Sequence, residues 1–271
     1  MGQIQEKNVK MEKIKKLKKI FDKEKIDGYL IPKNDEFFDE YLPLYNDRLN
    51  YISNFSGSFG FSLILKNNNY LFVDGRYTLQ AVKQSGAFFK IVTFPNFTPS
   101  DILKKGKYLI GYDPKLFTYK TLNIFSNKNI KLKPINDNLI DKIWKRKSRL
   151  SGKKFYTLPK NSAGENLKSK INKVIKNLKN TGADYQFISS SENNAWLFNI
   201  RGKDSKYSPI PHCYALVEKN SNIKFFCDLK KTPLSFRKKL KKIKFHDIKH
   251  TDKILSKINK KRFLVDKNSC S

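Results

Sequence analysis

The sequence predicts an α/β protein built from two tandem domains, each with a mixed sheet flanked by helices. Its 271 residues fit two domains of ordinary size. Helical and strand-like patterns alternate along the chain, and the second half repeats the order of the first. A hydrophobic content of 39%, with 21 Phe and 13 Tyr, is enough to fill real cores and excludes a disordered basic tail.

The first half begins with an amphipathic pattern. Apolar side chains at positions 11, 14, 17, 20 and 21 predict a helix over residues 10–25. The other expected elements follow in order: a strand at 29–31, a loop with a short helix at 34–54, a Gly/Ser turn at 56–60, a hairpin of 61–65 and 70–73, a helix at 78–84, strands at 88–93 and 108–111, and a helix from Thr118.

The second half predicts the same order again. Its elements are a helix at 167–178, a strand at 183–188, a hairpin of 214–217 and 223–227, a helix at 234–240, and strands at 243–245 and 263–266. Aspartates mark matching points of the two halves at offsets of 157, 154 and 153 positions: Asp27 and Asp184, Asp74 and Asp228, Asp113 and Asp266. We therefore expect an internal duplication of about six strands per copy. The domains would be residues 1–147 and 148–271, with a basic linker near 145–162.

Charge is the strongest compositional feature: 56 Lys+Arg against 24 Asp+Glu give a formal charge of +32. Only seven of the cations are arginine, whose forked guanidinium suits dedicated phosphate and base recognition. Lysine is spread along the whole chain together with 26 asparagines, as an AT-rich coding bias would produce. We interpret the charge as a solvated lysine surface and do not expect a nucleic-acid partner. Weak, salt-sensitive affinity for polyanions is the alternative.

The sequence has no run of eighteen apolar residues and no secretory signal, so we expect a cytoplasmic protein without a membrane span. Its three cysteines form no CxxC pair and are expected to be reduced thiols. Candidates for catalysis are few. His246 and His250 have i, i+4 spacing but follow a strand-like run, which favours exposed loop positions. Acid pairs such as Asp39-Glu40 favour a solvated face.

Two segments carry more specific signals. In Asp74-Gly75-Arg76-Tyr77, the glycine at the end of a strand would let Arg76 project towards a ligand or a partner carboxylate. The alternative is that Arg76 pairs with Asp74 or Glu40 and pins the loop. In the segment 192–202, Trp196, Leu197 and Ile200 are expected on one helical face, with Trp196 in the core rather than on a ligand platform; Arg201-Gly202 would end the helix.

These segments belong to a set of ordered motifs by which the chain resembles the first two domains of the three-domain Xaa-Pro aminopeptidases (aminopeptidase P). The matching runs are Glu40–Leu42, Arg48, Tyr51–Gly60, Phe72–Tyr77, Ile110–Pro114, Asn138–Trp144 and Ala195–Gly202. The resemblance spans roughly residues 11–270. It departs at Phe59, where the family prefers alanine, and at His212-Cys213, where the family usually has other residues.

The resemblance implies two creatinase-N-like domains without the family's pita-bread catalytic domain. In the family that third domain binds two divalent metals, commonly manganese, through two Asp, one His and two Glu, and removes an N-terminal residue that precedes proline. We therefore expect no cofactor, no metal ligand, no catalytic residue and no peptidase activity in this chain alone. It would be a truncated gene product, a fragment or an isolated N-terminal portion.

In the context of such a peptidase, the two domains would narrow access to the cleft for short peptides with proline in second position and support a homodimer. The expected substrate-binding residues are Arg76, with Glu40, Arg48 and Tyr77 around it, and Arg201 as a weaker candidate. The alternative is a stand-alone, non-enzymatic module that binds acidic proteins or nucleic acid.

Overall fold

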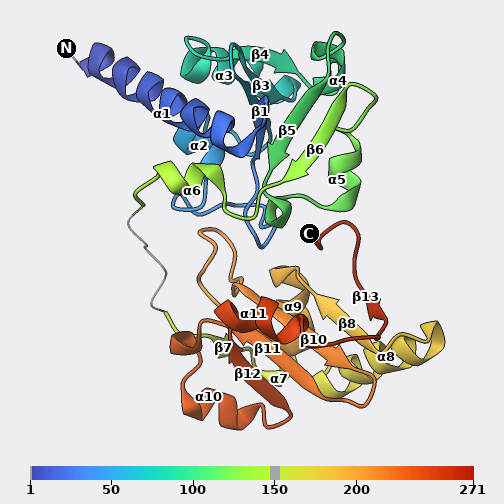
Figure 1. Ribbon diagram of the computed structural model, residues 1–271. Coiled ribbons are helices and arrows are strands. Elements are labelled where there is room, and N and C mark those ends of the chain that lie inside the picture. The colour runs from blue at the N-terminus through green and yellow to red at the C-terminus, as the bar shows by residue number, and fades with distance from the viewer. Residues whose placement is uncertain (1, 147–152) are drawn as a thin grey trace. The chain divides into compact units, whose positions relative to one another are not determined.

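The computed structural model describes residues 2–146 and 153–271, which form two compact units (Figure 1). Of these described residues, the first unit contains 2–36, 44–146 and Ser271, and the second contains 37–43 and 153–270. The boundary predicted between positions 147 and 148 lies outside the described residues. The short segment Phe37–Pro43 packs with the second unit, although it lies within the first half of the sequence.

The first unit is a six-stranded mixed sheet with helices on both faces. The strand order is β4 (Lys90–Thr93), β3 (Asn69–Val73), β2 (Phe61–Leu65), β1 (Gly28–Pro32), β5 (Tyr108–Tyr112) and β6 (Ile130–Pro134). The pairs β1–β2 and β2–β3 are antiparallel, and the remaining three are parallel. The helices are α1 (Gly2–Glu24), α2 (Arg48–Ser53), α3 (Thr78–Ser85), α4 (Pro99–Ile102), α5 (Tyr119–Asn123) and α6 (Leu139–Ile143).

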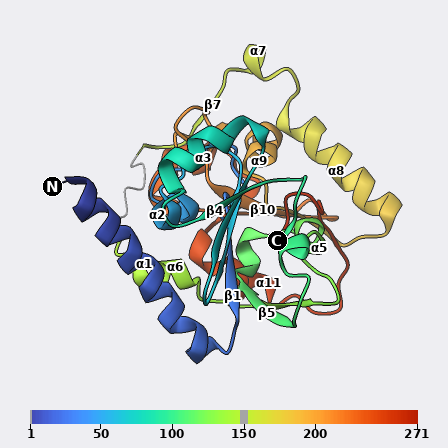
Figure 2. The same cartoon turned by 90° about the horizontal axis from the view of Figure 1, so that it is seen from above.

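Two hydrophobic clusters cover the two faces of this sheet. Leu17 and Phe21 of α1 pack with residues of α2, α3 and α6 on one face, where α1 runs beside α6 (Figure 2). Phe61 and Phe72 pack with Leu116 and Phe125 on the other face. Burial on both faces explains why β1 and β2 are mostly apolar throughout rather than alternating between apolar and polar residues.

The second unit repeats this topology with five strands, one fewer than predicted. The order is β12 (Ile243–Asp247), β11 (Ile223–Cys227), β10 (Cys213–Glu218), β8 (Tyr185–Ile188) and β13 (Phe263–Leu264), with β7 (Tyr156–Thr157) and β9 (Ile200–Arg201) in a separate pair. The helices are α7 (Lys160–Ala163), α8 (Leu167–Thr181), α9 (Ser191–Phe198), α10 (Leu234–Lys239) and α11 (Thr251–Leu255).

Matching hydrogen bonds confirm the predicted duplication in detail. The backbone N–H of Asp27 donates to the carbonyl of Leu109 at 2.8 Å, and the Asp27 carboxylate accepts from the N–H of Leu109 at 2.8 Å. Asp184 and Arg262 make the same two bonds, at 2.9 and 3.1 Å. In each unit an aspartate therefore joins the chain before the first sheet strand to the start of a parallel neighbour. The other four marker aspartates also match: the carboxylates of Asp74, Asp113, Asp228 and Asp266 each accept from the backbone N–H two residues further along the chain.

Several expectations in the second unit were wrong. Trp196 is 56% exposed rather than in the core, because α9 buries Ser191, Asn194, Ala195 and Phe198 and turns position 196 to the opposite side. The helix also ends earlier than predicted, at the left-handed residue Asn199 (φ 53°) rather than at Arg201-Gly202. His246 lies on strand β12, where it is half-buried. No helix among the described residues is long and apolar enough to cross a membrane.

Candidate functional site

Arg76 is an exposed cation held in place by its own loop. It lies in the short 3-10 helix Gly75–Tyr77 that follows β3. The Asp74 carboxylate accepts from the Arg76 backbone N–H at 2.9 Å and from Nη2 at 2.7 Å, yet the Arg76 side chain stays 71% exposed. The hydrogen bonds and charge of this pair raise the pKa of Arg76 and lower that of Asp74. Asp74 therefore orients the guanidinium while leaving its outer edge open to a ligand.

Tyr77 is fixed beside Arg76 by packing and by a hydrogen bond. The Arg76 guanidinium carbon lies 5.2 Å from the centre of the Tyr77 ring, and that ring meets Phe55 edge-on at 5.8 Å. The Tyr77 hydroxyl is 2.7 Å from Oγ of Ser58. A Cβ on Gly57 would lie 2.9 Å from the Tyr77 ring and 2.3 Å from that of Phe55, so only glycine fits beneath them. The Gly/Ser turn and the Arg76 loop thus form one rigid corner.

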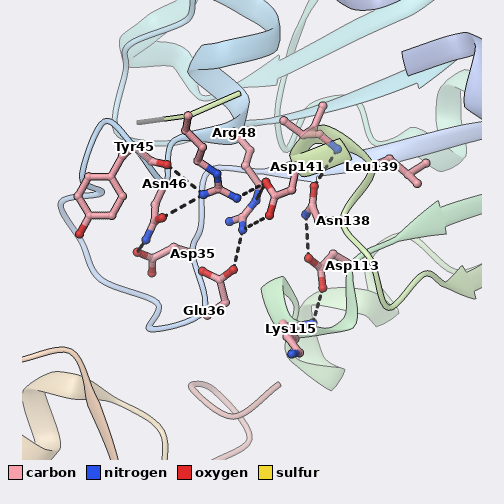
Figure 3. Close-up of polar contacts among 12 residues, drawn as sticks. Asp35, Glu36, Tyr45, Asn46, Arg48, Asp113, Lys115, Asn138, Leu139 and Asp141 are labelled. Carbon is pink, nitrogen blue, oxygen red and sulfur yellow. Dashed lines mark hydrogen bonds and ion pairs between the residues drawn. The ribbon is translucent and has the colours of Figure 1, made fainter. Parts of the chain in front are cut away.

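Arg48 has a different environment, although it belongs to the same unit (Figure 3). It is 3% exposed; Nε and Nη2 donate to the two oxygens of Asp141 at 2.9 and 2.8 Å, and Nη2 donates to Glu36 at 2.6 Å. Burial opposes its charge, but the hydrogen bonds and charges of Asp141 and Glu36 outweigh that cost and raise the pKa of Arg48. Arg146 also contacts Asp141. Arg48 thereby joins the segment before α2 to α6.

A cavity of about 410 Å³ lies beside this network and is lined mainly by polar groups, including Glu36, Asp113 and Asp141. The Asp113 carboxylate accepts from the Lys115 backbone N–H at 2.9 Å and from Asn138 at 2.7 Å. Burial raises the pKa of Asp113 despite these bonds. The oxygens of Asp113 and Asp141 are already bonded to neighbouring residues, which favours a structural role for this cluster.

Glu40 and Arg201, the two remaining candidates, belong to the second unit. Glu40 is exposed. Nη1 of Arg201 donates to the carbonyl of Ala195 at 2.6 Å and to that of Ile200 at 3.1 Å, so this guanidinium holds the C-terminal end of α9. Of the five candidates, the structure brings Arg76 and Tyr77 together. Arg48 lies in a separate network of the first unit.

A buried pair that the sequence did not predict attaches the segment Phe37–Pro43 to the second unit. Nε2 of His212 lies 2.5 Å from Oδ2 of Asp39, and the two side chains are 7% and 4% exposed. The Phe37 ring stacks on His212 at 4.1 Å. The one signal of this pair in the sequence was His212 itself, which stands where the family that the chain resembles usually has another residue.

Comparison with protein families assigns both units. Residues 13–143 match a family described as "Creatinase/Prolidase N-terminal domain". Residues 145–271 match a second family with the same description. The chain consists of two creatinase/prolidase N-terminal domains. It is similar to a probable Xaa-Pro aminopeptidase P of Coprinopsis cinerea, with 31% identity over 221 residues, and to Xaa-Pro aminopeptidase 1 of Dictyostelium discoideum, with 30% identity over 238 residues.

These relatives are much longer than the region they share with this chain. The matches cover 77% and 80% of the chain but only 35% and 37% of the two relatives. The X-prolyl aminopeptidase of Caenorhabditis elegans, described as a cytosolic enzyme with a di-nuclear active site, superposes with a TM-score of 0.84 at 27% identity. That match covers 91% of this chain and 44% of the worm enzyme. The predicted relationship to the N-terminal part of Xaa-Pro aminopeptidases is therefore confirmed.

Proposed function

We propose that these two domains are the non-catalytic N-terminal portion of a metal-dependent Xaa-Pro aminopeptidase of the cytoplasm, which removes an N-terminal residue that precedes proline. The observation that carries this proposal is the partial coverage of the worm enzyme: the two domains align almost in full, while more than half of that enzyme has no counterpart in the chain. The chemistry would belong to the remaining part.

The family's centre needs two Asp, one His and two Glu. The buried pair of Asp39 and His212 supplies two groups of these types, and its contact holds the segment Phe37–Pro43 in the second unit. This pair does not make such a centre. The two metals, manganese by resemblance, would bind in the catalytic domain and there supply a polarised water.

Arg76 is the residue we assign to the substrate. It combines an exposed guanidinium with a fixed corner, so it can hold a peptide carbonyl or C-terminal carboxylate without much loss of side-chain entropy. Next to it, α3 exposes Leu79 (87%) and Val82 (59%) on one face at i, i+3 spacing. This apolar face supports a role in contacts with a second subunit, and hence a homodimer.

The test of the Arg76 role is kinetic and uses the full-length enzyme. Arg76→Ala is expected to raise KM for Xaa-Pro peptides about tenfold with kcat little changed, since one charged hydrogen bond to the substrate is lost. Arg237→Ala is the matched control, because the Arg237 guanidinium donates hydrogen bonds to the carbonyls of Thr232 and Leu229 within the second unit. Unchanged kinetics of Arg76→Ala would refute the assignment.

A further inference from the structure

The loop that follows Arg201 in the second unit forms a cavity of about 420 Å³ with a strongly basic lining. Three lysines contribute to it, Lys153, Lys203 and Lys206, together with the serines at 205 and 208 and the ring of Tyr207. No carboxylate is among the described residues that line it. The cavity near Arg48 differs in this respect, because acidic side chains predominate there.

The loop is held in a fixed shape by its own backbone. The N–H of Gly202 donates to the carbonyl of Pro209 at 3.1 Å, and the N–H of Asp204 donates to that of Ile210 at 3.2 Å. A Cβ on Gly202 would lie 2.8 Å from Cα of Pro211, so the two ends of the loop approach as closely as glycine allows. The lysines and hydroxyls on the loop are therefore presented without the cost of ordering a flexible segment.

The one acid within the loop does not neutralise these lysines. The Asp204 carboxylate is buried, where it contacts the Lys231 ammonium and accepts from the backbone N–H of His212 at 2.9 Å. Among the described residues no acid pairs with Lys203 or Lys206, and both are exposed. Two other exposed lysines of this unit do have acidic partners: Lys219 pairs with Asp184, and Lys173 pairs with Glu165.

From this arrangement we propose that the cavity binds the polyphosphate group of a small molecule. Lysine ammonium groups and serine hydroxyls are the donors with which proteins bind phosphate. One phosphate monoester carries a charge of only about −1.5 to −2 at neutral pH, so three lysines match two or more linked phosphates. The site belongs to the second unit and the Arg76 corner to the first, and occupancy of the site does not depend on the proposed peptidase role.

The experiment is a calorimetric titration of the 271-residue chain with inorganic tripolyphosphate at low ionic strength. Lys203→Gln/Lys206→Gln is expected to weaken binding about tenfold or more, because two charged hydrogen bonds are lost. Lys238→Gln/Lys239→Gln on α10 is the charge-matched control in the same unit, and it is expected to bind within about twofold of the wild type, since those lysines do not line the cavity. Adenosine triphosphate should bind and adenosine should not.

Two results would overturn the proposal. Equal weakening by both double variants, or several tripolyphosphates bound per chain, would show attraction to the lysine surface as a whole. Adenosine binding as tightly as adenosine triphosphate would show that the cavity recognises a ring rather than phosphate. Both double variants replace exposed side chains, so circular dichroism should show unchanged folding.

Discussion

Removal of the Arg48 guanidinium is the sharpest perturbation of the first unit. Breaking a buried ion pair by deleting one partner typically costs about 3–5 kcal/mol. Here the side chains of Glu36 and Asp141 are 28% and 32% exposed, and Asp141 keeps Arg146 as a partner. We therefore expect Arg48→Ala to lower the free energy of unfolding by about 3 kcal/mol, at the lower end of that range.

Trp144 provides a probe of the unit that carries Arg48. Its ring stacks on Tyr51 at 4.6 Å and packs against the core cluster of the first unit. In a Trp196→Phe background its fluorescence reports urea unfolding of that unit. With a urea dependence of roughly 1.5 kcal/mol per molar, a loss of about 3 kcal/mol moves the midpoint down by about 2 M.

Two further variants decide whether the network is the cause. Arg48→Lys keeps the charge but loses the forked geometry, so we expect a smaller loss of about 1–2 kcal/mol. Arg76→Ala removes an exposed arginine from the same unit and should leave the urea midpoint unchanged within error. A loss below about 1 kcal/mol for Arg48→Ala, or one equal to that of Arg76→Ala, would refute the reasoning.

Three other predictions follow from particular residues. Gly202→Ala should destabilise the second unit by about 1–3 kcal/mol, measured by urea titration with circular dichroism, because its Cβ would lie 2.8 Å from Cα of Pro211. Gly75→Ala is the control and should be tolerated, because a Cβ there meets nothing within 4 Å. Equal effects of the two substitutions would contradict this reasoning. Burial and neighbouring cations lower the pKa of His246, so its ring should titrate below about 6.5 by NMR. The unfolded chain binds this proton at a higher pH than the folded chain does, so the free energy of unfolding falls as the pH drops below about 6.5. His246→Gln should reduce this dependence of the free energy of unfolding on pH. The 271-residue chain should not hydrolyse Xaa-Pro peptides with added manganese; turnover that a chelator abolishes would contradict this.

The sequence was sufficient to predict the two-domain α/β fold because its local signals agreed. Strands β1 and β2 are short, mostly apolar runs bounded by turns, and the aspartates at the strand ends recur because each caps a turn or joins two strands. The apolar spacing from Met11 placed α1, although the helix begins earlier, at Gly2, than that spacing indicated. The last strand of the second unit, expected at 263–266, is shorter than predicted and covers only Phe263–Leu264.

The features that the sequence could not predict depend on tertiary contacts. Trp196 is exposed because the short helix α9 turns its other side to the core, and Lys170 lies over its ring at 4.3 Å. The pairing of Asp39 with His212 joins residues 173 positions apart. The same holds for Arg48: its motif was recognised, but only the structure shows that Asp141, 93 positions away, accepts from its guanidinium.

The sequence of the transcript beyond the codon for Ser271 tests the central claim most directly. We predict that the reading frame continues and encodes the two Asp, one His and two Glu that bind the paired metals of Xaa-Pro aminopeptidases. A stop codon directly after Ser271, in the mature message, would contradict the proposed function and would favour a stand-alone binding module.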